Sequence, residues 1–270
     1  MKTPTTPATL PSTKLVARSL MFLLEVPHLL VAVAMILFAL DALLCIGNQL
    51  RPSSVRHTLP IVMTVALLRA VLRAWLRPGY LRALDELRRG AEPTVKAFEG
   101  LDRLGAAFAC HLLGDVIVAT SLVVGALPGL AAMLFAANRG YDALVGPALA
   151  LAALMSFSLY LYAWLGVRYA EHAVAIEGLG PFAALGRAWN LAEGRRARVA
   201  WVTLVTSTLE LAAVAWGVAC FGVGLLLTVP LARLVGDHTH VALFAELRAT
   251  SLRPRAHAGE ARAAMRRAPA

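Results

Sequence analysis

ALVGPALALAALMSFSLYLYAWLGV, residues 143–167, decides the fold of this chain. None of these 25 residues is charged, and about 20 predominantly apolar residues are enough for an α-helix to cross a bilayer. Tyr160, Tyr162, Trp164 and Tyr169 cluster at its end, as aromatic side chains do at a membrane surface. The stretch therefore predicts a transmembrane helix with an interfacial aromatic end.

The composition of the whole chain agrees with this interpretation. Of its 270 residues, 59% are hydrophobic and 16% are charged, whereas soluble domains average about 45–50% and 25%. We expect an all-α integral membrane protein, a helical bundle. The formal net charge of +10 does not indicate nucleic-acid binding, because the basic residues flank the apolar runs as topology signals do.

Hydropathy predicts about six transmembrane helices. They are expected at His28–Gly47, Leu59–Leu76, Leu104–Leu127, Ala143–Val167, Val199–Gly217 and Val218–Val235. The second requires Arg69 and Arg73 to snorkel to the surface. The third is expected to end at Pro128, which leaves residues 128–142 as an outer loop or a re-entrant segment.

The distribution of cations predicts the topology. With six spans and both termini in the cytoplasm, only Arg51, Arg56 and Arg139 of the 26 Lys and Arg residues lie outside, as the positive-inside rule favours. Composition indicates a bacterial inner membrane protein. Residues 1–10 and the basic residues 251–270 are expected to be disordered tails flanking a membrane domain at 11–250.

Residues 180–201, GPFAALGRAWNLAEGRRARVAW, predict an amphipathic helix in the cytoplasmic interface. Proline suits the first helical turn, glycine suits a helix end, and cations near the last turn complement the helix dipole. The residues assigned to this element are Pro181, Phe182, Leu185, Arg187, Trp189, Gly194 and Arg195.

A repeat is suggested by Gly-x-x-Pro, which occurs at Pro93 and again 88 residues later at Pro181. This spacing predicts three parallel units, each made of an interfacial helix and a membrane hairpin, at about 11–77, 90–170 and 178–250. The alternative is that all membrane-entry helices share such features.

Residues 178–201 resemble an element of a family of bacterial membrane proteins with about six spans. The matching residues are Glu177, Gly178, Ala184-Leu185-x-Arg187-Ala188-Trp189 and Leu191-x-x-Gly194-Arg195, with FAELRATS (244–251) resembling a second motif. The family includes the membrane domain attached to glycerophosphoryl diester phosphodiesterases and stand-alone relatives of unknown function. The resemblance covers about residues 90–250. It implies fold and location but no catalysis, because the phosphodiesterase barrel is a separate domain.

Ionisable residues within the expected spans are candidates for function. They are Asp41, His111, Asp115 and Glu210. Charged groups in a bilayer face the bundle interior or water, so they predict either a polar path or substrate pocket, or simple hydrogen bonds between helices.

Three arginines, Arg69, Arg73 and Arg77, repeat every four residues and share a helix face. They fit either a phosphate cradle for a lipid headgroup or a snorkelling topology signal. His238 and His240 beside Asp237 fit either metal ligands or a surface helix with solvated histidines and an aspartate N-cap; we favour the second.

The sequence as a whole favours a structural, anchoring or interaction component of the cell envelope without catalytic activity, cofactor or metal. A transporter or lipid-handling protein is the alternative, and an intramembrane enzyme comes third. The expected partners are anionic lipid headgroups, and the sequence leaves open a protein partner or a homo-oligomer.

Overall fold

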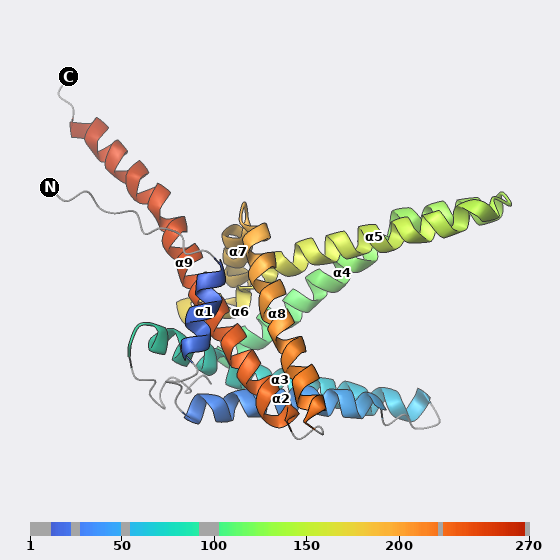
Figure 1. Cartoon of the computed structure of the whole chain (residues 1–270). Coiled ribbons are helices and arrows are strands. Elements are labelled where there is room, and N and C mark those ends of the chain that lie inside the picture. Colours follow the sequence, from blue (N-terminus) through green and yellow to red (C-terminus); the bar gives the residue numbers. More distant parts are fainter. Residues whose placement is uncertain (1–11, 23–27, 50–54, 92–102, 221–223, 268–270) are drawn as a thin grey trace. The chain divides into compact units, whose positions relative to one another are not determined.

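The structure is a computed structural model that describes residues 12–22, 28–49, 55–91, 103–220 and 224–267 (Figure 1). These residues form helices joined by short turns, and there is no β-strand among them, so the all-α class is confirmed. The chain divides into two compact units, residues 101–199 and residues 1–100 together with 200–270. Each unit is described by itself.

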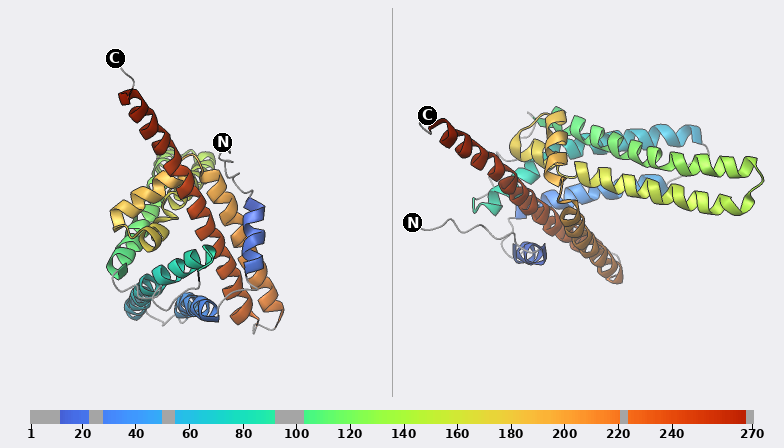
Figure 2. Two further views of the ribbon diagram at one scale, coloured as in Figure 1. Left: turned by 90° about the vertical axis from the view of Figure 1, so that its left-hand side faces the viewer. Right: turned by 90° about the horizontal axis from the view of Figure 1, so that it is seen from above.

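The central feature of the 101–199 unit is a long helical hairpin. Helix α4 (Leu104–Asn138) and helix α5 (Asp142–Val167) run antiparallel and side by side along their length, as the right-hand view in Figure 2 shows. The turn between them uses Gly140 with a φ of 71°, a left-handed conformation that glycine adopts readily.

Small residues form the seam of this hairpin. A Cβ atom on Gly129 would lie 2.5 Å from the Cα atom of Ala152, and one on Gly125 would lie 2.6 Å from the Cα atom of Ser156. Successive contacts move four residues forward in α4 and four residues back in α5. This antiparallel register brings Asp115 level with Gly166, at the end of the hairpin opposite its turn.

Helix α4 does not end at Pro128, as the sequence analysis expected; it continues for ten residues to Asn138 with the proline inside it. Residues 128–138 are therefore helical rather than an outer loop or a re-entrant segment. Proline removes one backbone donor, but within an apolar helix neighbouring groups can satisfy what it frees, so it does not have to terminate the helix. Pro147 is likewise inside α5.

Three short elements complete the 101–199 unit. Helix α6 (Ala170–His172) leads into the π-helix η3 (Ala173–Glu177), which ends at Gly178 with a φ of 70°. Helix α7 (Pro181–Ala192) follows. The boundary of the unit falls in the first turn of helix α8 (Arg196–Ala219).

The other unit is organised around helix α9 (Leu225–Arg267), which contacts α1 (Ser12–Phe22), α2 (His28–Gln49) and α3 (Val55–Arg88). Its core contains fully buried aliphatic and aromatic side chains from several helices. Among them are Leu30, Tyr80, Leu81, Leu84, Leu234, Leu243 and Phe244. The hydroxyl of Thr228 donates to the carbonyl oxygen of Ala213 at 2.8 Å and joins α9 to α8.

Three helical segments are long and apolar enough to cross a membrane: Leu104–Asn138, Asp142–Glu177 and Arg196–Ala219. They contain the third, fourth and fifth spans expected from the sequence. Among the described residues α2 holds a shorter apolar stretch, Leu30–Ala39, and α3 extends twelve residues past the expected end at Leu76.

Two further boundaries differ from expectation. The sixth span, expected at Val218–Val235, does not match one helix, because α8 ends at Ala219 and α9 begins at Leu225. The backbone is helical to Arg267 in the region expected to be a disordered tail; alanine and arginine, which are abundant there, have high helix propensity.

The glycine seam predicts opposite effects for two alanine substitutions in α4. Gly129→Ala should destabilise the protein by about 1–3 kcal/mol, because the new methyl group would overlap the backbone of Ala152. Gly114→Ala is the matched control, since its Cβ would lie 4.0 Å from its nearest neighbour, Val167. Thermal unfolding of the detergent-solubilised variants measures both. Equal midpoints for the two variants would contradict the packing of the seam.

Candidate functional site

The helix predicted from residues 180–201 forms α7, and Pro181 is its first residue, with Gly180 as the N-cap. Its buried face consists of Ala184, Ala188, Leu191 and Ala192. Phe182 is 76% exposed, whereas Leu185 and Trp189 are partly buried. The small alanines let α7 approach its neighbours closely, and the larger apolar side chains lie along its edges.

An ion pair ties α7 to the π-helix before it. The guanidinium of Arg187 donates from Nε to Oε2 of Glu177 at 3.2 Å and from Nη2 to Oε1 at 3.4 Å. Both nitrogens and both oxygens take part, which is the bidentate arrangement that arginine and carboxylate form well. The pair spans the turn at Gly178, so it holds η3 and α7 in one arrangement.

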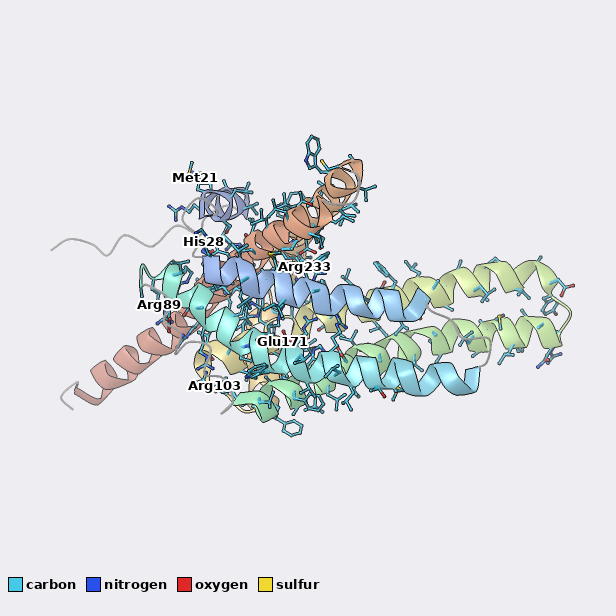
Figure 3. The ribbon with its side chains drawn as sticks, turned by 90° about the horizontal axis from the view of Figure 1, so that it is seen from below. Met21, His28, Arg89, Arg103, Glu171 and Arg233 are labelled. Carbon is cyan, nitrogen blue, oxygen red and sulfur yellow. The ribbon has the colours of Figure 1, made fainter. Side chains whose placement is uncertain are left out.

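A second arginine caps the same π-helix from α4. Nη1 of Arg103 donates to the carbonyl oxygens of Val174 at 3.1 Å and Ala175 at 2.5 Å. These carbonyls belong to the last turn of η3, where the helix dipole is negative, and that of Val174 also accepts from the backbone N–H of Gly178 at 3.2 Å. Figure 3 shows Arg103 and Glu171 toward the end of the unit opposite the hairpin turn.

An aromatic pair with a guanidinium against it lies where α5, α7 and α8 meet. The rings of Tyr162 and Trp189 pack edge to face, with centroids 5.5 Å apart. Trp189 also lies on Gly166, where a Cβ atom would come 2.5 Å from Cε3 of its ring. The Cζ atom of Arg196 is 3.8 Å from the Tyr162 centroid and 4.9 Å from that of Trp189. We call Tyr162, Trp189 and Arg196 the aromatic–arginine cluster.

The position of the cations after α7 corrects the dipole interpretation made from the sequence. Gly194 forms a left-handed turn, as expected, but α8 begins only two residues later at Arg196. Arg196 and Arg198 therefore belong to the first turn of α8, and Arg195 directly precedes it. A helix N-terminus carries partial positive charge. These cations add to the dipole of α8 and do not offset that of α7.

Two of the predicted intramembrane polar residues lie together, with a partner that the sequence analysis did not identify. Nδ1 of His111 is 3.0 Å from Oε1 of Glu171, and its Nε2 is 3.5 Å from Oδ2 of Asp115. The Asp115 side chain is 70% exposed. Asp41 lies in α2, but its side chain is outside the described residues.

Glu210 belongs to the other unit, and its carboxylate faces α9. A Cβ atom on Gly236 would lie 3.6 Å from Oε1 of Glu210 and 3.6 Å from the Cβ atom of Thr206. The absence of a side chain on Gly236 thus makes room for polar groups of α8 beside α9. Glu210 accordingly points between helices, as a carboxylate in a membrane segment should.

One arginine of the expected stripe, Arg77, forms an ion pair with Asp237, which the sequence predicted to be a helix N-cap. Nη2 of Arg77 donates to Oδ1 of Asp237 at 3.3 Å, and both side chains are 19% exposed. Arg69 and Arg73, on the same helix, are partly buried. Burial raises the pKa of the nearby Tyr80 phenol, and the negative charge of Asp237 raises it further. The pair therefore joins α3 to α9.

The structure corrects the interpretation of residues 237–240. Asp237 is not an N-cap, because α9 begins twelve residues earlier, and His238 and His240 are buried rather than solvated. Nδ1 of His238 is 2.8 Å from the hydroxyl oxygen of Ser19 in α1, and Nε2 of His240 is 3.4 Å from that of Thr206 in α8. The two histidines thus connect helices.

Further polar groups are paired locally. Asp85, which is buried, accepts from Arg88 at 2.9 Å and also from Arg89, the first residue after α3. Within the described residues no group of three or more His, Cys, Asp and Glu side chains is arranged to hold a metal ion.

Comparisons with known protein families, with curated protein sequences and with solved structures find no match. The resemblance to the phosphodiesterase-associated membrane domain therefore stays a prediction.

The burial of His238 predicts a pH dependence of stability. Burial, reinforced by the charge of Arg88, lowers the pKa of His238 from 6.5 to about 4. Between these two pKa values the imidazole of His238 is protonated in the unfolded chain and neutral in the folded chain. The free energy of unfolding therefore has its full value above pH 6.5 and falls as the pH is lowered toward 4. The loss should be roughly 3 kcal/mol, at 1.36 kcal/mol per pKa unit.

The variant His238→Asn isolates this effect, because its amide can bond to Ser19 in place of Nδ1 but does not titrate. Unfolding of the solubilised protein between pH 4 and 7.5 should show the stability advantage of the natural chain over the variant shrinking toward pH 4. Parallel pH profiles for the two proteins would contradict the assignment.

Proposed function

We propose that this chain is an integral protein of a bacterial inner membrane that acts as a non-catalytic anchoring or interaction component of the cell envelope. The observation that carries the proposal is the α4–α5 hairpin. Along its apolar windows only 11% of the residues are buried within the protein. Large exposed apolar surfaces mark membrane or partner contact, and here the exposed side chains cover two helices of membrane-spanning length.

The charge-free parts of the hairpin fit a bilayer. Residues 116–138 and 143–167 carry no charged side chain, and at 1.5 Å per residue they are about 34 and 37 Å long, against roughly 30 Å of hydrocarbon. Arg139 and Asp142 then lie at one membrane surface. Asp115 and Arg168 lie at the other, because the hairpin register brings Asp115 level with Gly166.

We further propose six spans with both termini in the cytoplasm. Helices α2 and α3, which contact each other, supply the first two spans, and α9 supplies the last one. The base of the α4–α5 hairpin and α7 then lie on the cytoplasmic side. The three-unit repeat and the resemblance to the phosphodiesterase-associated membrane domain agree with this arrangement and are part of the proposal.

The geometry of the polar residues supports a structural role over transport. The two predicted acidic residues whose side chains are described lie beside groups of neighbouring residues. Asp115 is at the hairpin base beside His111, and Glu210 faces Gly236 of α9. Lipid handling is the second candidate, and the aromatic–arginine cluster is the observation that favours it.

Two substitutions test the structural role. Asp115→Asn should leave the yield of monodisperse protein and its thermal midpoint nearly unchanged, because the carboxylate is mostly exposed. Trp189→Ala should lower the stability by about 3–5 kcal/mol, since its ring packs on Gly166 and Tyr162. Size-exclusion chromatography and thermal unfolding give both results. Equal damage from the two changes would contradict a structural role for the cluster and favour a functional carboxylate.

The topology is tested by labelling single cysteines in intact cells, in a chain whose own three cysteines are replaced by alanine. Arg139→Cys at the hairpin turn should react with a membrane-impermeant maleimide added outside. Glu193→Cys after α7 should react only once the cells are opened. Both positions are exposed in the structure. Labelling of both positions from the same side would end the proposed placement of the hairpin.

A further inference from the structure

The guanidinium of Arg196 has unmet hydrogen-bonding capacity. Its Nε and Nη2 atoms are buried and have no hydrogen-bond acceptor among the described residues. Its contacts are with the faces of Tyr162 and Trp189. Aromatic faces stabilise a cation but do not replace the in-plane acceptors that its N–H groups require. By contrast, Arg187 donates to the carboxylate of Glu177, and Arg103 donates to backbone carbonyls.

An acceptor from outside the chain can approach the guanidinium of Arg196 on the side of Nη1. Arg196 as a residue is only partly buried, and of its three guanidinium nitrogens Nη1 is the one that is not among the buried atoms without a partner. The two rings hold the guanidinium plane in place, so an anion approaching its edge meets a donor that is already oriented. Such preorganisation favours binding, because less rotamer freedom is lost when the complex forms.

The charge around this edge selects an anion. Arg195, Arg196 and Arg198 cluster within four residues at the start of α8, and the positive end of the α8 dipole points the same way. Phosphate, like carboxylate, matches the donor fork of arginine in its geometry.

The surroundings indicate where that phosphate comes from. Tyr162 lies five residues before the end of α5, in a run with Tyr160, Trp164 and Tyr169 that has the composition of an interfacial aromatic belt. Arg168 lies over Trp164 with its Cζ atom 4.7 Å from the ring centroid, a second arginine–aromatic contact at this end of α5. At the depth of such a belt the abundant phosphates are those of lipid headgroups.

We propose that the aromatic–arginine cluster is a binding site for the phosphate group of an anionic phospholipid, with Arg196 as the residue that binds it. The inference rests on the proposed membrane function and makes it more specific. It also moves the lipid contact from the expected stripe at Arg69, Arg73 and Arg77, where Arg77 is engaged by Asp237, to the start of α8.

A fluorescence titration of the full chain in detergent micelles tests the site. Four of the five tryptophans, Trp75, Trp164, Trp201 and Trp216, are replaced by Phe so that the emission reports on Trp189 alone. The probes are short-chain phosphatidylglycerol, phosphatidylcholine with the same acyl chains, and inorganic phosphate. We expect a saturable change with phosphatidylglycerol at concentrations at least about tenfold lower than with either other probe.

Three variants in the same background decide the role of Arg196. Arg196→Gln should weaken phosphatidylglycerol binding by about tenfold or more, which is what losing a hydrogen bond to a charged group costs. Arg196→Lys keeps the charge without the planar fork and should fall between. Arg139→Gln is the matched control, because Arg139 also lies over a ring, that of Phe135 with its Cζ atom 5.6 Å from the centroid, but at the hairpin turn. It should bind like the parent chain.

Each alternative outcome overturns the site. Equal binding of phosphatidylcholine would show no selection for anionic lipid, equal binding of inorganic phosphate would show a site for the free ion, and undiminished binding by a folded Arg196→Gln would remove Arg196 from it. If Arg196→Gln does not fold, Arg196→Lys decides, and unweakened binding by it overturns the proposal. Membrane insertion itself is checked separately by the cysteine labelling, so failure of the lipid site and failure of the membrane function give different results.

Discussion

The close approach of α4 and α5 along their small residues is the interaction on which the 101–199 unit depends. Between helices in lipid there is no hydrophobic driving force, so association relies on dispersion contacts between surfaces that fit closely. Gly125 and Gly129 remove side chains where Ser156 and Ala152 come nearest. The contact also fixes the register, and the register decides that His111 meets Glu171 and that Asp115 comes level with Gly166. The partners of these polar groups therefore follow from a packing constraint farther along the same helices.

Arginine performs three different tasks in this unit, and they differ in what accepts the N–H groups. Arg103 donates to backbone carbonyls at the end of η3, and Arg187 donates to the carboxylate of Glu177. The guanidinium of Arg196 lies against the rings of Tyr162 and Trp189, and its Nε and Nη2 atoms have no hydrogen-bond acceptor among the described residues. A charge withdrawn from water needs compensating partners, and the first two arginines have them within the chain. For the third, the described residues supply no acceptor to Nε and Nη2, which is why its cluster is the candidate for the proposed contact with lipid.

The sequence predicted well what is encoded locally. Apolar runs located α2, α5 and α8 to within a few residues, and the Gly-Pro pair located the start of α7. The sequence did not predict the hydrogen-bonded pairs between distant positions. His238 bonds to a serine 219 positions away, and Arg77 bonds to an aspartate 160 positions away. Periodicity along one helix does not encode which helix packs against it. The misplaced end of α4 has another cause, because taking Pro128 as a stop applies a rule for helices in water, where a freed backbone group has other choices.

The length of α4 resolves a difficulty that the shorter expected span would have created. A span at residues 104–127 would put Asp115 near the bilayer centre, where an acidic side chain costs about 2.5–3.5 kcal/mol on insertion scales. Because α4 continues to Asn138, the charge-free residues 116–138 can fill the hydrocarbon, and Asp115 moves to its boundary. The same shift brings His111 and Glu171 to that boundary as well, together with the arginine-rich start of α8 that follows α7. A helix that continues through its proline thus allows His111, Asp115 and Glu171 to lie together at one membrane surface, where water and headgroups can solvate them.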